Sequence, residues 1–387
     1  MDRIYLDHAA TTPMRSEVQQ ALAEAVARTF GNASSVHSFG QEAKKLLEES
    51  RERAALRIGA APDELVFTSG GTESDNLAIR GAAYALRDKG NHIVTTTIEH
   101  HAVLNCCKAL EDEGFEVSYI PVDAECLVDP EAVAGAMRPE TILVSVMMAN
   151  NETGTVEPIA EIGDMARKAG VAFHTDAVQA VGKIPVDVEE LGVDLLSVSG
   201  HKIYGPKGVG ALYVRRGTPL RQLVYGGHHE RSLRPGTENV AGIAAFAKAI
   251  ELAVEELPEA DANLRRLKET LAAGIIEKIP AVRRNGSREC SLPHILNTSF
   301  EGVEGESLLL NLDLMGIAVS TGSVCTSGAT DPSHVLLAMC LASQLAQSSM
   351  RFSFGRDNTT AQVERLLEVL PEIVARLREL SAIKMNN

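Results

Sequence analysis

The chain has 387 residues, with 37 Lys and Arg against 52 Asp and Glu, which gives a formal net charge of −15. A protein this acidic repels nucleic acid, and an aromatic content of 4% without any Trp leaves little surface for base stacking. The length suggests about two or three domains, and a hydrophobic content of 45% excludes a disordered chain.

The sequence also lacks the features of membrane, secreted and metal-binding proteins. No apolar run approaches the roughly 20 residues that cross a bilayer, and the first residues show no hydrophobic signal stretch. The six cysteines form no CxxC pattern, and in a chain of this length they are typical of reduced thiols rather than of a disulfide framework. We therefore expect a cytoplasmic enzyme that contacts no membrane and carries no metal.

Short apolar runs alternate with helical patterns from the N-terminus to about residue 238. A capping box at Ser38–Gln41 predicts a helix that ends at Gly59, and a strand at 64–68 precedes a helix over about 72–88. Further strands are expected at residues 93–97, 117–121, 141–148, 171–175, 195–198 and 209–214. Strands separated by helices indicate βαβ units, so we expect an α/β fold with a mainly parallel sheet.

The pattern changes beyond residue 238. One long amphipathic helix is expected at 238–257, ending near Pro258, a second at 260–278 and a last one at about 360–380. Short strands and helices alternate between the second and the last of these helices. We place a domain boundary near residue 257.

The segment Ser69-Gly70-Gly71-Thr72 follows a predicted strand and opens a helix. Glycines let backbone amides approach an anion, and a helix N-terminus adds its dipole and free N–H groups, so the segment is typical of a phosphate-binding turn. A plain helix start capped by Thr72, with Asp75 three residues on, explains the same residues. No GxGxxG is present, and Pro206 stands where a P-loop in residues 200–207 needs lysine, so ATP or a dinucleotide is not expected.

Two further segments carry groups that suit a Schiff-base cofactor. Asp176 ends an apolar strand, where a carboxylate can pair with a protonated ring nitrogen; a helix cap, with Gln179 three residues on, is the alternative. Lys202 lies between a strand and a Gly-rich turn, where partial burial lowers the pKa of an amine and favours a Schiff base, although most lysines are solvated surface groups. Together with the phosphate-binding turn, these residues supply what pyridoxal 5′-phosphate (PLP) needs.

Cys325 lies in a small, polar, Gly-containing segment, residues 318–332. Structural cysteines are usually buried among apolar residues, so this setting indicates a reactive thiol on a loop that brings it to a substrate; an incidental exposed thiol is the alternative. The other five cysteines lie in helical or nondescript contexts and carry no predicted role.

Ten segments spread along the chain match the pattern of one enzyme family. They are residues 5–13, 30–35, 68–76, 99–103, 150–154, 174–179, 199–208, 234–237, 320–327 and 351–353. On these segments the sequence resembles the cysteine desulfurases of the NifS/IscS kind, within the class V aminotransferase-like PLP enzymes. The cysteine loop, which most PLP relatives lack, is the most specific match, and Cys340 is a departure because glycine is expected there.

The resemblance implies fold type I of the PLP-dependent aminotransferases. A large domain, residues 15–257, would contain the mainly parallel sheet and bind the cofactor. A smaller α+β domain, made from residues 1–14 and 258–387, would carry the catalytic cysteine loop.

The resemblance also assigns roles to individual residues. Lys202 would hold the cofactor and act as the base at the substrate α-carbon, and Cys325 would attack the substrate sulfur. His100 would stack on the ring and shuttle protons, the alternative being a satisfied histidine at a helix start. Further cofactor contacts are expected from Gly71, Thr72, Asn151, Asp176, Gln179, Ser199, His201 and, from the second subunit of a homodimer, Thr237. The substrate would be held by Asn32, Asn151 and Arg351.

The implied reaction is the PLP-dependent removal of sulfur from L-cysteine, which gives L-alanine and a persulfide on Cys325. The sulfur would pass to an acceptor, most often an iron–sulfur scaffold protein, while nitrogenase maturation and tRNA thiolation stay open as pathways. A selenocysteine lyase, another class V PLP enzyme such as an aminotransferase, and a catalytically silent partner in sulfur trafficking are the alternatives. Direct binding of nucleic acid is not expected.

Overall fold

The computed structural model of the protein describes residues 3–321 and 331–380, so Cys325 lies outside the described residues. Its larger part is built on a seven-stranded sheet with the strand order β2-β8-β7-β6-β5-β3-β4. The strands are β2 (Leu65–Thr68), β8 (Gly210–Val214), β7 (Leu195–Ser199), β6 (Ala172–Asp176), β5 (Thr141–Ser145), β3 (His92–Thr96) and β4 (Glu116–Ile120). Neighbouring strands are parallel, except that β8 runs antiparallel to both β2 and β7. The predicted α/β fold with a mainly parallel sheet is therefore confirmed.

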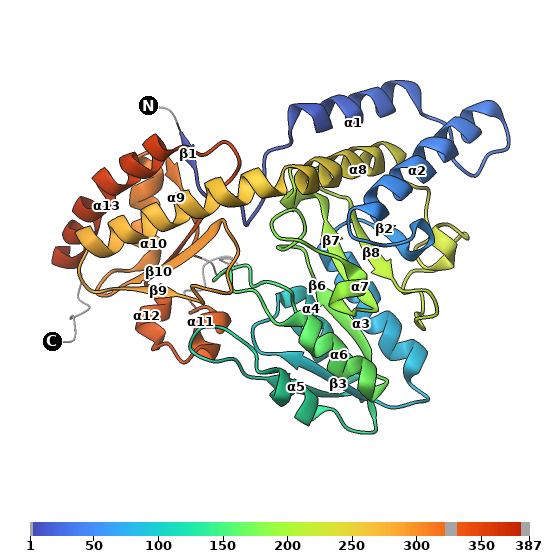
Figure 1. Ribbon diagram of the computed structural model, residues 1–387, viewed down its shortest axis with the longest axis horizontal. Coiled ribbons are helices and arrows are strands. Elements are labelled where there is room, and N and C mark those ends of the chain that lie inside the picture. The colour runs from blue at the N-terminus through green and yellow to red at the C-terminus, as the bar shows by residue number, and fades with distance from the viewer. Residues whose placement is uncertain (1–2, 322–330, 381–387) are drawn as a thin grey trace.

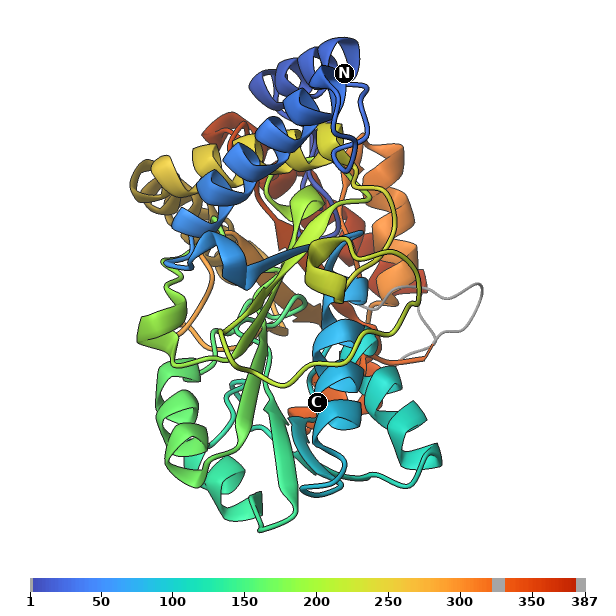
Figure 2. The same ribbon diagram turned by 90° about the vertical axis from the view of Figure 1, so that its right-hand side faces the viewer.

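The sheet is covered by helices on both faces (Figure 2). Leu65 and Phe67 of β2 belong to one hydrophobic cluster, whereas Val66 between them belongs to another, because successive side chains of a strand point to opposite faces. The helices of this part are α1 (Ser16–Arg28), α2 (Ser38–Leu56), α3 (Gly71–Leu86), α4 (His101–Asp112), α5 (Pro130–Ala136), α6 (Ile159–Ala169), α7 (Val188–Leu191) and α8 (Val240–Glu255). Helices α3 and α4 share the Val66 cluster, and α2, α6 and α8 supply the other.

The smaller part brings together the two ends of the described chain (Figure 1). Strand β1 (Ile4–Tyr5) pairs in parallel with β11 (Ile317–Ala318), and an antiparallel sheet has the order β12-β10-β9. Its other elements are β9 (Val282–Asn285), β10 (Ile295–Phe300), β12 (Ser349–Ser353), α9 (Leu257–Lys278), α10 (Gly305–Leu314), α11 (His334–Ala338), α12 (Ser343–Gln347) and α13 (Thr360–Leu380). One hydrophobic cluster joins Ile4 and Leu6 to apolar side chains from residues 264–374.

Two predicted helix boundaries are wrong. The cap of α2 is His37, whose Nδ1 accepts a hydrogen bond from the Gly40 N–H at 3.3 Å, rather than the expected box beginning at Ser38. Helix α9 begins at Leu257 rather than at the expected residue 260, so Pro258 stands in its first turn, where its missing N–H has no partner to lose.

None of the helices within residues 3–321 and 331–380 combines the length and the apolar character needed to cross a membrane. Within the same residues, no group of three or more His, Cys, Asp or Glu side chains is placed to hold a metal ion.

Candidate active site

A cavity of about 330 Å³ lies where β6 and β7 end, beside the N-terminus of α3. Its walls come from both parts of the molecule, since the segment before α1 and strand β12 also contribute. It is lined by Ala9, Ala10, Gly71, Thr72, Asp75, His100, Met147, Ala149, Asn151, Asp176, Val178, Gln179, Ser199, His201, Lys202 and Arg351. The structure thus brings together most of the predicted site residues, which lie far apart in the sequence.

The N-terminus of α3 has no side-chain cap. Gly70 is the N-cap residue, with a φ of 149°, and Thr72 lies inside the helix, so the interpretation of Thr72 as the cap is wrong. A Cβ on Gly71 would lie 2.8 Å from Cγ2 of Val178, which explains why this close approach needs glycine. The uncapped helix start, with Ser199 and His201 on the same cavity wall, suits an anion such as a phosphate.

Asp176 is the last residue of β6 and is buried. Its Oδ1 accepts a hydrogen bond from the Val178 N–H at 2.9 Å. The next helix, α7, begins only at Val188, so the alternative that Asp176 caps a helix is wrong. Burial raises the pKa of its carboxyl, and the charges of His100 and Lys202 oppose this shift. Gln179 donates from Nε2 to the Ala9 carbonyl at 2.9 Å, which ties the segment before α1 to this end of the sheet.

Lys202 ends the short 3₁₀ turn η2 (Gly200–Lys202) that follows β7. Its Nζ donates hydrogen bonds to the carbonyl oxygens of Ala9 at 2.5 Å and Ala10 at 2.8 Å. All three residues line the cavity. Burial, with the charge of Arg351, lowers the pKa of the amine to about 8. Lys202 is therefore not a solvated surface lysine, and about half of its amine is neutral at pH 8.

His100 both caps a helix and lines the cavity. It is the N-cap of α4, where its Nδ1 accepts a hydrogen bond from the Ala102 N–H at 3.1 Å, and it also lines the cavity. Because Nδ1 acts as an acceptor, the neutral ring carries its proton on Nε2. Burial lowers the pKa of the imidazole, while the charge of Asp176 raises it.

Arg351 of β12 is buried and reaches into the cavity from the smaller part. It donates from Nη1 to the Asn151 carbonyl at 2.8 Å and from Nη2 to Oδ1 of Asp7 at 2.8 Å. Its Nε has no hydrogen-bond partner among the described residues. A buried guanidinium that lines a cavity suits a carboxylate ligand.

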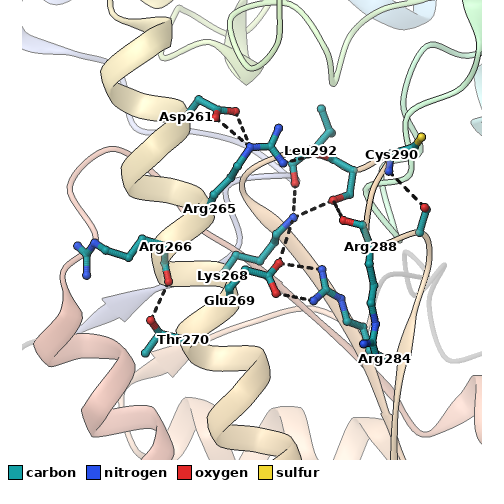
Figure 3. Close-up of polar contacts among 12 residues, drawn as sticks. Asp261, Arg265, Arg266, Lys268, Glu269, Thr270, Arg284, Arg288, Cys290 and Leu292 are labelled. Atoms are coloured by element: carbon teal, nitrogen blue, oxygen red, sulfur yellow. Dashed lines mark hydrogen bonds and ion pairs between the residues drawn. The ribbon is translucent and has the colours of Figure 1, made fainter.

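A polar cluster around Lys268 joins α9 to the loop before β10 (Figure 3). Lys268 of α9 is buried, and its Nζ donates to Ser291 Oγ at 3.0 Å and to the Leu292 carbonyl at 2.8 Å. The Leu292 N–H in turn donates to the Gly154 carbonyl at 2.7 Å. Helix α9 is thereby connected, through the loop before β10, to the turn that carries Asn151.

Two predicted residues do not line this cavity, and a third lies outside the described residues. Asn32 uses its Oδ1 to accept from the Ser34 N–H at 2.8 Å, and Thr237 is exposed, and neither is part of the cavity lining. Cys325 lies outside the described residues. Cys340 adopts a φ of 60°, a backbone conformation that favours the glycine expected from the family pattern.

Asp75 lines the cavity, yet the sequence indicated only a helix-capping role for it. It is buried, and its Oδ1 has no hydrogen-bond partner among the described residues and lies 3.7 Å from Nε2 of His174. Burial raises the pKa of this carboxyl, and the charge of Asp176 raises it further. The sequence feature that could have indicated this role is the position of Asp75 near the start of α3, close to Gly71.

The remaining thiols divide into two groups. Cys106, Cys107 and Cys126 are buried, and burial raises the pKa of each thiol, that of Cys106 to about 12. Cys290 and Cys340 are exposed. Since the thiolate is the nucleophile, the three buried cysteines are poorly suited to attack a substrate.

Comparison with known proteins identifies the family. Residues 4–366 match the family Aminotransferase class-V. The chain is 52% identical over 381 residues to a protein of Dictyoglomus turgidum named cysteine desulfurase IscS, covering 98% of this chain and 97% of that protein. It is 50% identical over 380 residues to the cysteine desulfurase IscS of Methanosarcina thermophila, covering 98% of this chain and 94% of that protein.

Solved structures agree with the sequence matches. A NifS-like protein superposes with a TM-score of 0.92 at 39% identity, covering 97% of this chain and 100% of that chain. A structure described as SspA in complex with cysteine superposes with a TM-score of 0.81 at 37% identity, covering 91% of this chain and 98% of that chain. The chain therefore belongs to the aminotransferase class-V family and, within it, to the cysteine desulfurases of the NifS/IscS kind.

Proposed function

We propose that this cysteine desulfurase uses PLP to convert L-cysteine to L-alanine and leaves the sulfur as a persulfide on Cys325, for delivery to iron–sulfur cluster assembly. The observation that carries the proposal is the cavity lined together by Lys202, Asp176 and Arg351, which brings an amine, a carboxyl and a guanidinium to one place. These groups match an aldehyde, a ring nitrogen and a carboxylate.

The residues of the cavity fit PLP. The uncapped N-terminus of α3, with Thr72, Ser199 and His201, would hold the phosphate, and Asp176 would pair with the ring nitrogen. Gln179 would face the ring oxygen, and His100 would lie against the ring. When bound, the pyridoxal ring acts as an electron sink for the bonds at the substrate α-carbon.

Lys202 is suited to proton transfer at the substrate. Its lowered pKa of about 8 means that its amine takes up and releases a proton near neutral pH, as a general base must. The carbonyls of Ala9 and Ala10 hold Nζ at the cavity wall, which fixes the direction from which it acts.

Arg351 would orient the substrate through its carboxylate. Nη1 bonds the Asn151 carbonyl and Nη2 bonds Asp7, which fixes the guanidinium plane at the wall of the cavity. Asn151 lines the same wall and would add a side-chain contact. Asn32 stays a sequence-based prediction of a substrate contact.

The sulfur step can be written with all atoms balanced. The Cys325 thiolate attacks the substrate sulfur, an S–S bond forms and the carbon–sulfur bond of cysteine breaks. The electron pair of that bond remains on carbon, which takes up a proton to become the methyl group of alanine. The Cys325 thiol is thereby oxidised to a persulfide, while the substrate carbon is reduced.

We further propose a homodimer in which Thr237 of each chain completes the phosphate site of the other. This is supported by the exposure of Thr237 and by its absence from the cavity of its own chain. The separate hydrophobic cluster of Ile4, Leu6 and residues 264–374 supports a large domain of residues 15–257 and a small domain of 1–14 with 258–387. The five cysteines in the described residues are free, which supports a cytoplasmic location.

The test is an assay of purified protein reconstituted with PLP. With L-cysteine and a reducing thiol, it should release sulfide and alanine in equal amounts, and Lys202→Ala should lose both the products and the visible absorbance of the attached cofactor. Amino acid and 2-oxo acid pairs, and L-selenocysteine, are assayed in parallel. Preference for either over L-cysteine, or a wild-type protein without cofactor absorbance, contradicts the proposal.

A further inference from the structure

Three successive residues with side chains adopt left-handed backbone conformations in the segment before α8. Glu230, Arg231 and Ser232 form the turn η3 (Glu230–Ser232) and have φ angles of 43°, 54° and 64°. L-residues rarely adopt this conformation, and a run of three is kept only where surrounding contacts over-determine it. The contacts that hold this turn therefore point to what it positions.

The first anchor is a buried ion pair at the outer edge of the sheet. Glu230 accepts two hydrogen bonds from the Arg51 guanidinium, at 2.8 Å and 2.6 Å, and both side chains are buried. Glu230 also accepts from the Phe67 N–H at 2.8 Å, and Arg51 donates to the Leu65 carbonyl at 2.8 Å. Since β2 is an edge strand, these side chains occupy backbone groups that a further strand would otherwise pair.

The second anchor joins the same segment to the phosphate-binding turn. Arg234 donates from Nε to Oε1 of Glu73 at 2.9 Å, and Oε2 of Glu73 accepts from the Ser69 N–H at 2.6 Å. Glu73 lies in the first turn of α3, next to Thr72. The segment is fixed again at Asn239, the N-cap of α8, so Thr237 lies between two anchored points.

The free side of this segment suits contact with another copy of the chain. Thr237 is exposed and does not line the cavity of its own chain. Earlier in the same stretch, Val224 and Tyr225 are 60% and 74% exposed, although both are apolar enough to favour burial. The anchored segment thus leaves Thr237 exposed, and the exposed Val224 and Tyr225 precede it in the same stretch of chain.

We propose that the Arg51–Glu230 pair is a positioning device that fixes residues 230–237 so that Thr237 reaches the cofactor phosphate of a second copy. The inference rests on the homodimer of the proposed function. Arg51 and Glu230 touch neither substrate nor cofactor in this arrangement. They act through Thr237 and only at the neighbouring chain's site.

Heterodimers with a single competent site test this directly. Two differently tagged chains are co-expressed and the mixed dimer is purified, with Lys202→Ala in one chain so that only the other can attach PLP. In the first arrangement Glu230→Gln shares a chain with Lys202→Ala, so the competent site faces the altered segment. In the second arrangement Glu230→Gln lies on the competent chain itself.

The first arrangement should weaken PLP binding about tenfold or more, which corresponds to the loss of a charge-assisted hydrogen-bond network. The second should bind PLP within about twofold of the heterodimer that carries Lys202→Ala alone, because its competent site receives an unaltered segment. Adding Thr237→Ala to the chain with Glu230→Gln should cause little further loss, since both changes act through one contact. Equal weakening in both arrangements, or none in either, overturns the inference.

A matched control uses the ion pair of Arg53, which lies on the same helix, α2, as Arg51. Glu251→Gln breaks the Arg53–Glu251 pair, which joins α2 to α8 and leaves residues 230–237 untouched. It should leave PLP affinity unchanged in both arrangements. Should Glu230→Gln fail to fold, Arg51→Lys keeps the charge, loses the two-pronged contact and should show the same asymmetry. A wild-type protein that is monomeric or binds no PLP contradicts the proposed function, whereas an active dimer without the asymmetry contradicts only this inference.

Discussion

The guanidinium of Arg351 donates a hydrogen bond to the carboxylate of Asp7 at 2.8 Å, across 344 positions of the sequence. The same guanidinium donates to the Asn151 carbonyl at 2.8 Å, so it joins the N-terminal segment, the turn after β5 and strand β12. Its position depends on three separate segments, which together fix the guanidinium at the wall of the cavity.

Arg351→Lys should raise the KM for L-cysteine about a hundredfold, because a lysine ammonium cannot bond Asp7, Asn151 and a substrate carboxylate in one plane. The visible absorbance of bound PLP should be retained, since Arg351 is assigned to the substrate. Steady-state kinetics and an absorbance spectrum measure the two effects. The exposed Arg356→Lys serves as the matched control and should leave KM unchanged. A normal KM in Arg351→Lys contradicts the assignment.

The attachment of PLP to the apo-protein should depend on pH through Lys202. Burial lowers the pKa of this amine to about 8, and only the neutral amine attacks an aldehyde. The rate of attachment should therefore rise with pH and level off above about pH 8. Stopped-flow absorbance from pH 6 to pH 10 measures this, with Lys202→Ala as the blank. A midpoint near the ordinary lysine value of 10.5 would show that the amine is not buried as described.

The fold and part of the cavity, namely the turn at Gly71 and Thr72, Asp176 and Lys202, follow from local sequence patterns, whereas the other predicted cavity residues came from the family resemblance. Asp176 and Lys202 each come directly after a strand, and strands of a parallel sheet end at a common edge, so their proximity could be expected from the sequence. Thr72 was open to two interpretations because a helix start serves as a cap or as an anion site. The N-cap at Gly70 excludes Thr72 as the cap, and that is a backbone geometry no residue type specifies alone.

The contacts that orient these groups were beyond sequence reasoning. Lys202 is held by the carbonyls of Ala9 and Ala10, and backbone acceptors carry no sequence signal. The pairs Arg351–Asp7 and Arg51–Glu230 join residues 344 and 179 positions apart, through the packing of separate segments. The helix cap at His37 was missed for a different reason, since histidine is not among the usual N-cap residues.

Cys325→Ala should abolish the production of both sulfide and alanine while the absorbance of bound PLP persists. The exposed thiols Cys290 and Cys340 supply matched controls, because their replacement by serine should leave both products unchanged. Mass spectrometry after a brief reaction with L-cysteine should find one added sulfur on Cys325. Turnover by Cys325→Ala, or an added sulfur confined to Cys290 or Cys340, contradicts the assignment of the nucleophile.

Glu157→Gln should make the stability of the folded protein less dependent on pH between about pH 5 and pH 8. Burial raises the pKa of the Glu157 carboxyl to about 8, against 4.5 for an ordinary glutamate, and its Oε1 has no hydrogen-bond partner among the described residues. Because the folded state binds this proton more tightly than the unfolded state, the contribution to stability is full below pH 4.5 and is lost as the pH rises through 8. The glutamine variant has no such proton, so its stability relative to wild type should increase by about 3 kcal/mol over this window.

Thermal melts at each pH measure the change as a Tm difference of several degrees, and the exposed Glu161→Gln should show none. Parallel melting curves for wild type and Glu157→Gln across this range would mean that Glu157 is ionised in the folded protein.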